Sequence, residues 1–95
     1  MEDKKTYIDK LAAQLNEWDA KLDVMEAEAE KSKADMKLKY QQNIDRLKTK
    51  RKEVDDKLKE IKQASDTAWQ ELKSGFEKSW NDLKSSIERA LAELK

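Results

Sequence analysis

The chain contains no cysteine and no histidine among its 95 residues. Without cysteine there can be neither a disulfide nor thiol chemistry, which is compatible with a reducing cytosol. Without histidine the chain lacks the usual proton shuttle near neutral pH and the commonest metal ligand. These two absences remove the side chains on which most catalytic and zinc sites depend.

Proline is also absent, glycine occurs once, and no long apolar run is present. No stretch approaches the roughly 20 apolar residues that are needed to cross a bilayer. Four charged residues follow Met1 in place of an apolar segment, so we do not expect a secretory signal. We therefore expect a soluble, cytoplasmic protein without a transmembrane segment.

What the chain does have is charge, at 44% of its residues, against 37% hydrophobic residues. A sequence dominated by Ala, Glu, Lys, Leu and Asp is typical of long helices and coiled coils. Its length allows one folding unit. Because a chain this short and polar buries little surface by itself, we expect self-association.

Apolar or small residues recur along the chain in alternating steps of three and four. The first run consists of Ile8, Leu11, Leu15, Trp18, Leu22, Met25, Ala29, Ser32 and Met36. After a stutter at residues 36–44, through Tyr40, the spacing resumes with Ile44, Leu47, Arg51, Val54, Leu58, Ile61, Ser65, Ala68 and Leu72. A disordered chain would not keep this phase, so the pattern predicts helices with one apolar seam.

An eleven-residue repeat follows in the last third of the chain. Residues 69–79 and 80–90 share five of eleven positions, and each copy opens on tryptophan. Eleven residues complete three helical turns, so the repeat returns the same side chains to one face. That stripe consists of Trp69, Leu72, Phe76, Trp80, Leu83, Ile87, Leu91 and Leu94. Gly75 lies inside the repeat, and we expect close packing beneath Phe76 and Trp80 to be the reason for it.

Charge is unevenly distributed although the total is zero. Residues 1–30 hold nine acids and four bases, and residues 31–62 hold twelve bases and six acids. The acidic third is therefore expected to lie beside the basic third. Two antiparallel chains crossing near Leu38 would place residues 8–30 opposite 46–68. A hairpin at the stutter would make the same pairs within one chain, so charge leaves both arrangements open.

A break in the helix is most strongly indicated at residues 64–67. This Ala-Ser-Asp-Thr segment is the densest group of capping residues, and Thr67 with Gln70 fits a capping box. Against a break, the apolar spacing passes through the segment without losing step. A turn and a continuous helix both remain open there. A rod over residues 4–95 would be roughly 140 Å long and could not be stable unless its seam were covered.

Sites for chemistry are weakly indicated. The basic cluster of Lys48, Lys50, Arg51 and Lys52 could contact phosphates, but interspersed acids and a balanced total charge favour a solvated helix face over nucleic-acid binding. Glu26, Glu28 and Glu30 lack the spacing of a metal site. A helical rod provides no cleft that could shift paired carboxylates apart in pKa. We expect no enzyme activity, no metal and no cofactor.

The carboxy-terminal sequence, together with two segments near the start of the chain, resembles a known family. The segment Ala64-Ser65-Asp66-Thr67-Ala68-Trp69-Gln70-Glu71-Leu72-Lys73-Ser74-Gly75-Phe76-Glu77-Lys78-Ser79-Trp80 follows Tyr7-Ile8-Asp9-Lys10-Leu11 and Glu17-Trp18-Asp19. Together they are similar to small bacterial coiled-coil-domain proteins that are loosely grouped as stress-response proteins. The resemblance spans nearly the whole chain, with Trp18, Trp69, Gly75 and Trp80 as its most specific points. It implies a helical fold and a stress-associated role, and it brings no catalytic residue or ligand.

Together these patterns predict an all-α, elongated coiled coil or long helical hairpin that forms a single folding unit. Residues 1–63 would hold one long heptad helix, from about Thr6 to Gln63. Residues 64–95 would hold an amphipathic helix from about Thr67 to Leu94. The seam would be buried in an antiparallel homodimer or a larger bundle.

Two functions are compatible with this prediction. The first is a non-catalytic coiled-coil interaction protein that self-associates. The second is a reversible amphipathic-helix binder of lipid or other apolar surfaces, as in apolipoprotein-like, granule-coating or desiccation-protective helices. The residues expected to carry assembly are Ile8, Leu11, Leu15, Trp18, Leu22, Ile44, Leu47, Val54, Leu58, Ile61, Trp69, Leu72, Phe76, Trp80, Leu83, Ile87, Leu91 and Leu94.

Overall fold

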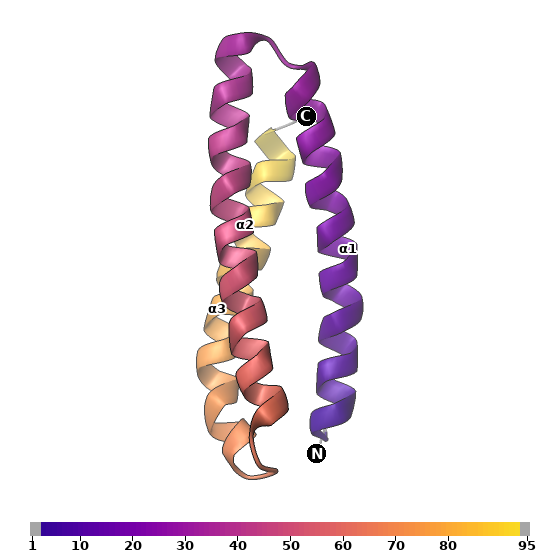
Figure 1. The fold of residues 1–95 in the computed structure, drawn as a ribbon, viewed down its shortest axis with the longest axis vertical. Coiled ribbons are helices and arrows are strands. Elements are labelled where there is room, and N and C mark those ends of the chain that lie inside the picture. The colour runs from indigo at the N-terminus through magenta and orange to yellow at the C-terminus, as the bar shows by residue number, and fades with distance from the viewer. Residues whose placement is uncertain (1–2, 94–95) are drawn as a thin grey trace.

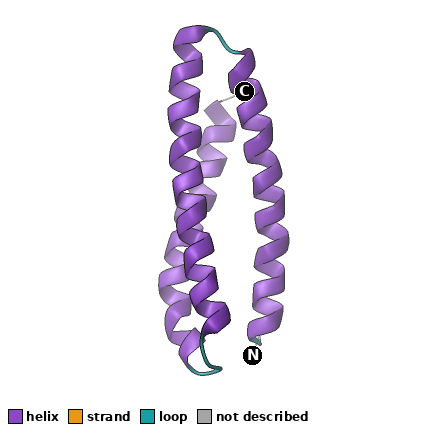
Figure 2. Ribbon diagram, in the orientation of Figure 1, coloured by secondary structure: helices purple, strands orange, loops and turns teal. Residues whose placement is uncertain are grey.

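A computed structural model describes residues 3–93, which form three helices in an up-down-up arrangement (Figure 1). Helix α1 covers Lys4–Lys31, α2 covers Ala34–Gln63 and α3 covers Ala68–Glu93. Two short turns connect them, drawn in teal in Figure 2. The bundle is elongated, with extents of 51 × 18 × 18 Å. The predicted all-α, elongated fold is confirmed, whereas a single rod is not what forms.

Helix α1 begins at a side-chain cap. The Thr6 backbone N–H donates to Oδ1 of Asp3 at 2.7 Å, and the Tyr7 N–H donates to the Asp3 carbonyl at 3.1 Å. An aspartate at this position satisfies an amide that has no partner within the helix. The hydrogen bond from the Thr6 backbone favours the charged form and lowers the pKa of Asp3.

The first turn lies at Ser32 and Lys33, so the predicted continuous helix from Thr6 to Gln63 is wrong. Both residues are extended, with φ/ψ of −78°/160° at Ser32 and −64°/153° at Lys33. The break precedes the stutter at 36–44 and has neither glycine nor proline to mark it. Its physical reason is burial: folding back lets α2 cover the seam of α1, which a single rod would leave in water.

The second turn occupies residues 64–67, where the sequence had left a turn and a continuous helix open. The Ala68 N–H donates to Oγ of Ser65 at 3.2 Å, and the Trp69 N–H donates to the Ser65 carbonyl at 3.1 Å. The capping hydrogen bond therefore comes from Ser65, two residues before the predicted Thr67. The turn reverses the chain and places α3 beside α2, antiparallel to it and parallel to α1 (Figure 1).

One apolar core runs the length of the bundle. Within residues 3–93 no polar or charged side chain is buried. The buried side chains are Tyr7, Leu11, Leu15, Trp18, Leu22, Met25, Ala29, Ile44, Leu47, Val54, Leu58, Ile61, Trp69, Phe76, Leu83 and Ile87. Ile8, Tyr40, Ala64, Trp80, Ala90 and Leu91 pack against them while partly exposed. The seam is thus covered by the three helices of one chain, so covering it does not require a second copy.

Two local expectations are wrong. Gly75 lies on an exposed face, and a Cβ built there would meet nothing within 4 Å, so close packing does not explain this glycine. Leu72 is 37% exposed, because the α3 face that enters the core is centred on Trp69, Phe76 and Leu83.

Within residues 3–93, none of the helices has both the length and the apolar character that crossing a bilayer requires.

Candidate functional site

The aromatic side chains of the chain gather where α1 meets α3. Of six aromatic residues, five lie there: Tyr7 and Trp18 on α1, and Trp69, Phe76 and Trp80 on α3. Only a few backbone positions of α1 and α3 approach each other closely, whereas α2 runs close to both neighbours. Large rings therefore fill the space between α1 and α3, which stand further from each other than either stands from α2.

The five rings form one continuous series, which we call the aromatic ladder. The Tyr7 ring centroid lies 5.4 Å from that of Trp69 and 6.2 Å from that of Phe76, the latter pair edge to face. Phe76 lies 5.7 Å from Trp80, whose ring lies 4.5 Å from that of Trp18. These separations suit tilted and edge-to-face pairs, each of which contributes about 0.5–1.5 kcal/mol beyond burial.

The register of the ladder follows from matching periods. Trp69 and Trp80 are eleven residues apart, and so are Tyr7 and Trp18. Eleven residues complete three turns, so each pair lies on one face of its helix. Because α1 and α3 are parallel, equal spacing brings Tyr7 to Trp69 and Trp18 to Trp80. The repeat of α3 thus has a counterpart on α1.

A polar group covers the amino-terminal end of the ladder. The Lys73 ammonium lies 4.8 Å from the Tyr7 ring centroid and 5.7 Å from that of Trp69, within cation–π range. Glu77 accepts a long hydrogen bond of 3.4 Å from the Tyr7 hydroxyl and lies 3.9 Å from Lys73. Helix α3 therefore supplies both the ring partners of Tyr7 and the charges that surround its polar edge.

Lys4 fixes the first turn of α1 to the end of α2. Its Nζ donates to the carbonyl oxygens of Lys62 at 3.0 Å and Ala64 at 2.7 Å. Carbonyls at a helix carboxyl end lack partners within the helix and carry partial negative charge, so a lysine ammonium stabilises them. This contact holds α1 at the end of the bundle where Tyr7 enters the ladder.

A groove of about 440 Å³ lies between α1 and α3 at the Trp18–Trp80 end of the ladder. The apolar side chains that line it are Leu11, Trp18, Trp80, Ile87 and Leu91. Lysine and glutamate side chains line it too, with Lys10, Lys21 and Lys84 alternating with Glu17 and Glu88. Trp80 and Leu91 are only half-buried, so part of the apolar lining of the groove is open to solvent.

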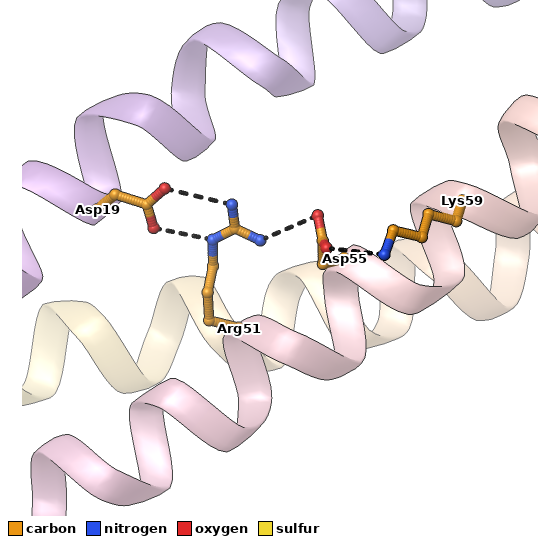
Figure 3. Close-up of polar contacts among 4 residues, drawn as sticks. All are labelled: Asp19, Arg51, Asp55 and Lys59. Atoms are coloured by element: carbon orange, nitrogen blue, oxygen red, sulfur yellow. Dashed lines mark hydrogen bonds and ion pairs between the residues drawn. The ribbon is translucent and has the colours of Figure 1, made fainter.

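The opposite junction, between α1 and α2, is polar at its edge. Arg51 donates from Nε and Nη2 to the two carboxylate oxygens of Asp19, at 2.9 and 3.2 Å, and its Nη1 lies 3.5 Å from Asp55 (Figure 3). Asp55 also faces Lys59 at 3.8 Å. Burial alone would lower the pKa of Arg51, but the hydrogen bonds and charge of Asp19, followed by those of Asp55, outweigh burial and raise it.

The same junction confirms that acidic α1 faces basic α2. Lys48 forms an ion pair with Glu26, and that hydrogen bond and charge raise the pKa of Lys48. Lys37 lies 3.0 Å from Glu30 near the turn. Of the two arrangements that charge left open, the structure adopts the hairpin within one chain.

The basic cluster is divided between both neighbouring helices. Lys48 and Arg51 face α1, while Lys50 donates to Asp82 at 3.2 Å and to Ser86 at 2.9 Å on α3. These cations are therefore spread around α2 and hold it to both partners.

Most residues predicted to carry assembly lie in the core of the single chain. Ile8, Trp80 and Leu91 are half-buried, Leu72 is exposed, and Leu94 lies outside the described residues. Tyr7, Met25 and Ala29 are buried but were not among the predicted assembly residues. Met25 and Ala29 continue the apolar spacing of α1. Tyr7 could have been found by its eleven-residue distance from Trp18, the distance that separates Trp69 from Trp80.

The fold defines an antiparallel three-helix bundle with an aromatic α1–α3 junction. Comparison with protein-family models, with curated proteins and with solved structures gives no match to this chain. Membership of the bacterial coiled-coil family, and the stress-associated role that it implies, stay predictions.

Proposed function

We propose that this protein is a non-catalytic binder of apolar surfaces that hides its binding face in the three-helix bundle. On meeting a lipid layer or a comparable apolar surface, α1 would leave the α2–α3 hairpin, and α1 and α3 would then lie on that surface. The observation that carries this proposal is the aromatic ladder, which joins α1 to α3 through ring contacts and includes two tryptophans of α3. Tryptophan favours the boundary between water and lipid.

The uniform chemistry of the core supports an exchange of partners. No polar side chain is buried within residues 3–93, so buried hydrogen bonds between side chains do not tie the helices to one another. Contacts between apolar side chains depend on area and fit, and they tolerate another apolar partner. The polar contacts that do cross between helices lie at the exposed edges, where each contributes little.

The energetics make opening conditional on a surface. Helix α1 buries seven side chains, and exposing its six large ones to water would cost on the order of 10 kcal/mol. A bundle of ordinary stability would therefore keep α1 closed in water. An apolar surface would return most of that free energy, because it removes the same side chains from water.

The charge of α1 and α3 together predicts the lipid preference. Helix α1 carries seven acids and five bases and α3 carries five acids and four bases, so the two helices hold three more acids than bases and are not attracted to anionic headgroups. We expect neutral phosphatidylcholine vesicles to bind the protein better than vesicles with added anionic lipid, and added salt to reduce this difference.

A test must not rely on the emission wavelength alone. Trp18 and Trp69 are only 5% and 4% exposed, so their emission is expected to be blue-shifted before any lipid is added. We suggest neutral vesicles whose acyl chains carry bromine, which quenches tryptophan only by contact within the bilayer. Binding through the hidden face predicts strong quenching.

A clamped variant provides the matched control. The chain has no cysteine, so Asp19→Cys with Arg51→Cys places a single pair of thiols across α1 and α2. Joining them with a short bis-maleimide should prevent opening and abolish quenching, whereas the same variant capped with N-ethylmaleimide should still be quenched. Absence of quenching in the native protein, or equal quenching in the clamped one, would refute the proposal.

A further inference from the structure

We infer that a second copy of this chain can replace α1 in the bundle, giving a domain-swapped dimer. In that dimer the turn at Ser32 and Lys33 straightens, α1 and α2 join into one helix, and α1 packs on the α2–α3 hairpin of the partner copy. This inference concerns self-association and does not depend on binding to apolar surfaces.

The turn itself is poorly protected against straightening. It consists of two residues, neither of them glycine or proline, and no residue of the chain that the structure describes, 3–93, has positive φ. Ser32 Oγ already donates to the Glu28 carbonyl four residues earlier, and the Ser32 N–H donates to Ala29. Only the backbone dihedrals of Ser32 and Lys33 must change for the helix to continue, and short hinge loops of this kind favour swapping.

The apolar seam keeps its phase across the turn. Ala29, Ser32, Met36 and Tyr40 follow one another by three or four residues, as they would on one face of a continuous helix. In the monomer this stretch does not bury all of its apolar side chains, because Met36, just beyond the turn, is 41% exposed. In the swapped dimer the two continuous helices cross at this point, where each Met36 would meet the seam of the other copy.

The ion pairs between α1 and α2 suit both forms. Glu30–Lys37, Glu26–Lys48 and Asp19–Arg51 are nested around the turn at increasing distance from it. In an antiparallel dimer with its two-fold axis near the turn, the same pairs form between copies. Swapping therefore keeps the core and the charge pairs. The equilibrium between monomer and swapped dimer then depends on the conformational preference of the turn and on the entropy that is lost when two chains associate.

Two variants shift this balance in opposite directions. Lys33 has φ of −64°, the value that a proline ring imposes, and Ser32 is already extended, as the residue before proline prefers. Lys33→Pro should fit the turn and disfavour the continuous helix by about a hundredfold per chain. Ser32→Ala with Lys33→Ala should favour it, lowering the dissociation constant of the dimer about tenfold.

The test is sedimentation across a concentration series up to millimolar, with a link between chains as the second measurement. Chains carrying only Asp19→Cys are mixed with chains carrying only Arg51→Cys, unfolded and refolded together, and treated with a short bis-maleimide. The swap predicts a covalent heterodimer, increased by the double-alanine background and lost with Lys33→Pro. A double-alanine variant that stays monomeric, a Lys33→Pro variant that still dimerises, or a dimer without this link would overturn the inference.

Discussion

Trp80 connects the two halves of the aromatic ladder, and its removal tests whether the ladder holds α1 to α3. Its ring lies 4.5 Å from Trp18 and 5.7 Å from Phe76, so Trp80→Ala breaks both ring contacts at once. A fully buried tryptophan costs about 3–5 kcal/mol when it is cut back to alanine. Because Trp80 is half-buried, we expect a loss of about 2–3 kcal/mol in the free energy of unfolding.

The assay is urea unfolding followed by circular dichroism at the helix band, because the substitution itself changes the fluorescence. For a domain of this size a loss of 2–3 kcal/mol corresponds to roughly 10–20 °C in Tm. Leu72→Ala is the matched control in the same repeat: Leu72 is 37% exposed, and we expect it to cost less than about 1 kcal/mol.

A double-mutant cycle separates the ring contact from simple loss of volume. Trp18→Ala and Trp80→Ala are measured singly and together, and the 4.5 Å ring contact should appear as a coupling of about 1 kcal/mol. Equal effects of Trp80→Ala and Leu72→Ala, or additive effects of the two tryptophan substitutions, would refute the view that the ladder fastens α1.

Three further outcomes follow from local geometry. Gly75→Ala should raise the free energy of unfolding by about 1 kcal/mol in urea titration, because the added Cβ meets open space in the middle of a helix; a loss of stability would contradict the exposed placement. Asp3 has a lowered pKa in the folded chain, so its contribution to the free energy of unfolding should be complete at pH values well above its ordinary pKa of 3.8. That contribution should disappear as pH falls through the folded pKa. Asp3→Asn keeps an acceptor and should flatten that part of the pH profile. The Arg51–Asp19 pair is half-exposed, so an alanine double-mutant cycle should give a coupling of about 1 kcal/mol or less that weakens with added salt.

The apolar seam shows which buried residues can be predicted from the spacing of apolar residues in the sequence. Steps of three and four selected Leu15, Leu47, Val54 and Ile61, all of which are buried, because residues at that spacing share one face of a helix. The same reasoning misplaced Leu72, which the spacing included but the core excludes. Periodicity identifies the face of a helix that is apolar, whereas the edge of the covered strip depends on where the neighbouring helices lie.

Tyr7 and Gly75 show the same limit for the ladder. Tyr7 stands outside the heptad spacing and is buried because α1 runs parallel to α3, which brings it against Trp69 and Phe76. Gly75 is next to Phe76 in sequence, but adjacent residues on a helix point in different directions, and the glycine faces solvent. The eleven-residue distance to Trp18 places Tyr7 on the same face of α1 as Trp18, but the ring partners of Tyr7 and the exposure of Gly75 depend on the path of the chain.

The amino-acid sequence alone determined the helical class, the apolar face of each helix and the attraction between an acidic first third and a basic second third. These depend on spacing and charge, which are properties of neighbours along the chain. The tertiary structure alone decided that the chain turns at Ser32 and Lys33 and covers its own seam. No local signal marks that turn, since a straight helix would preserve the spacing equally well, and only the burial of one helix against another distinguishes the hairpin from the rod.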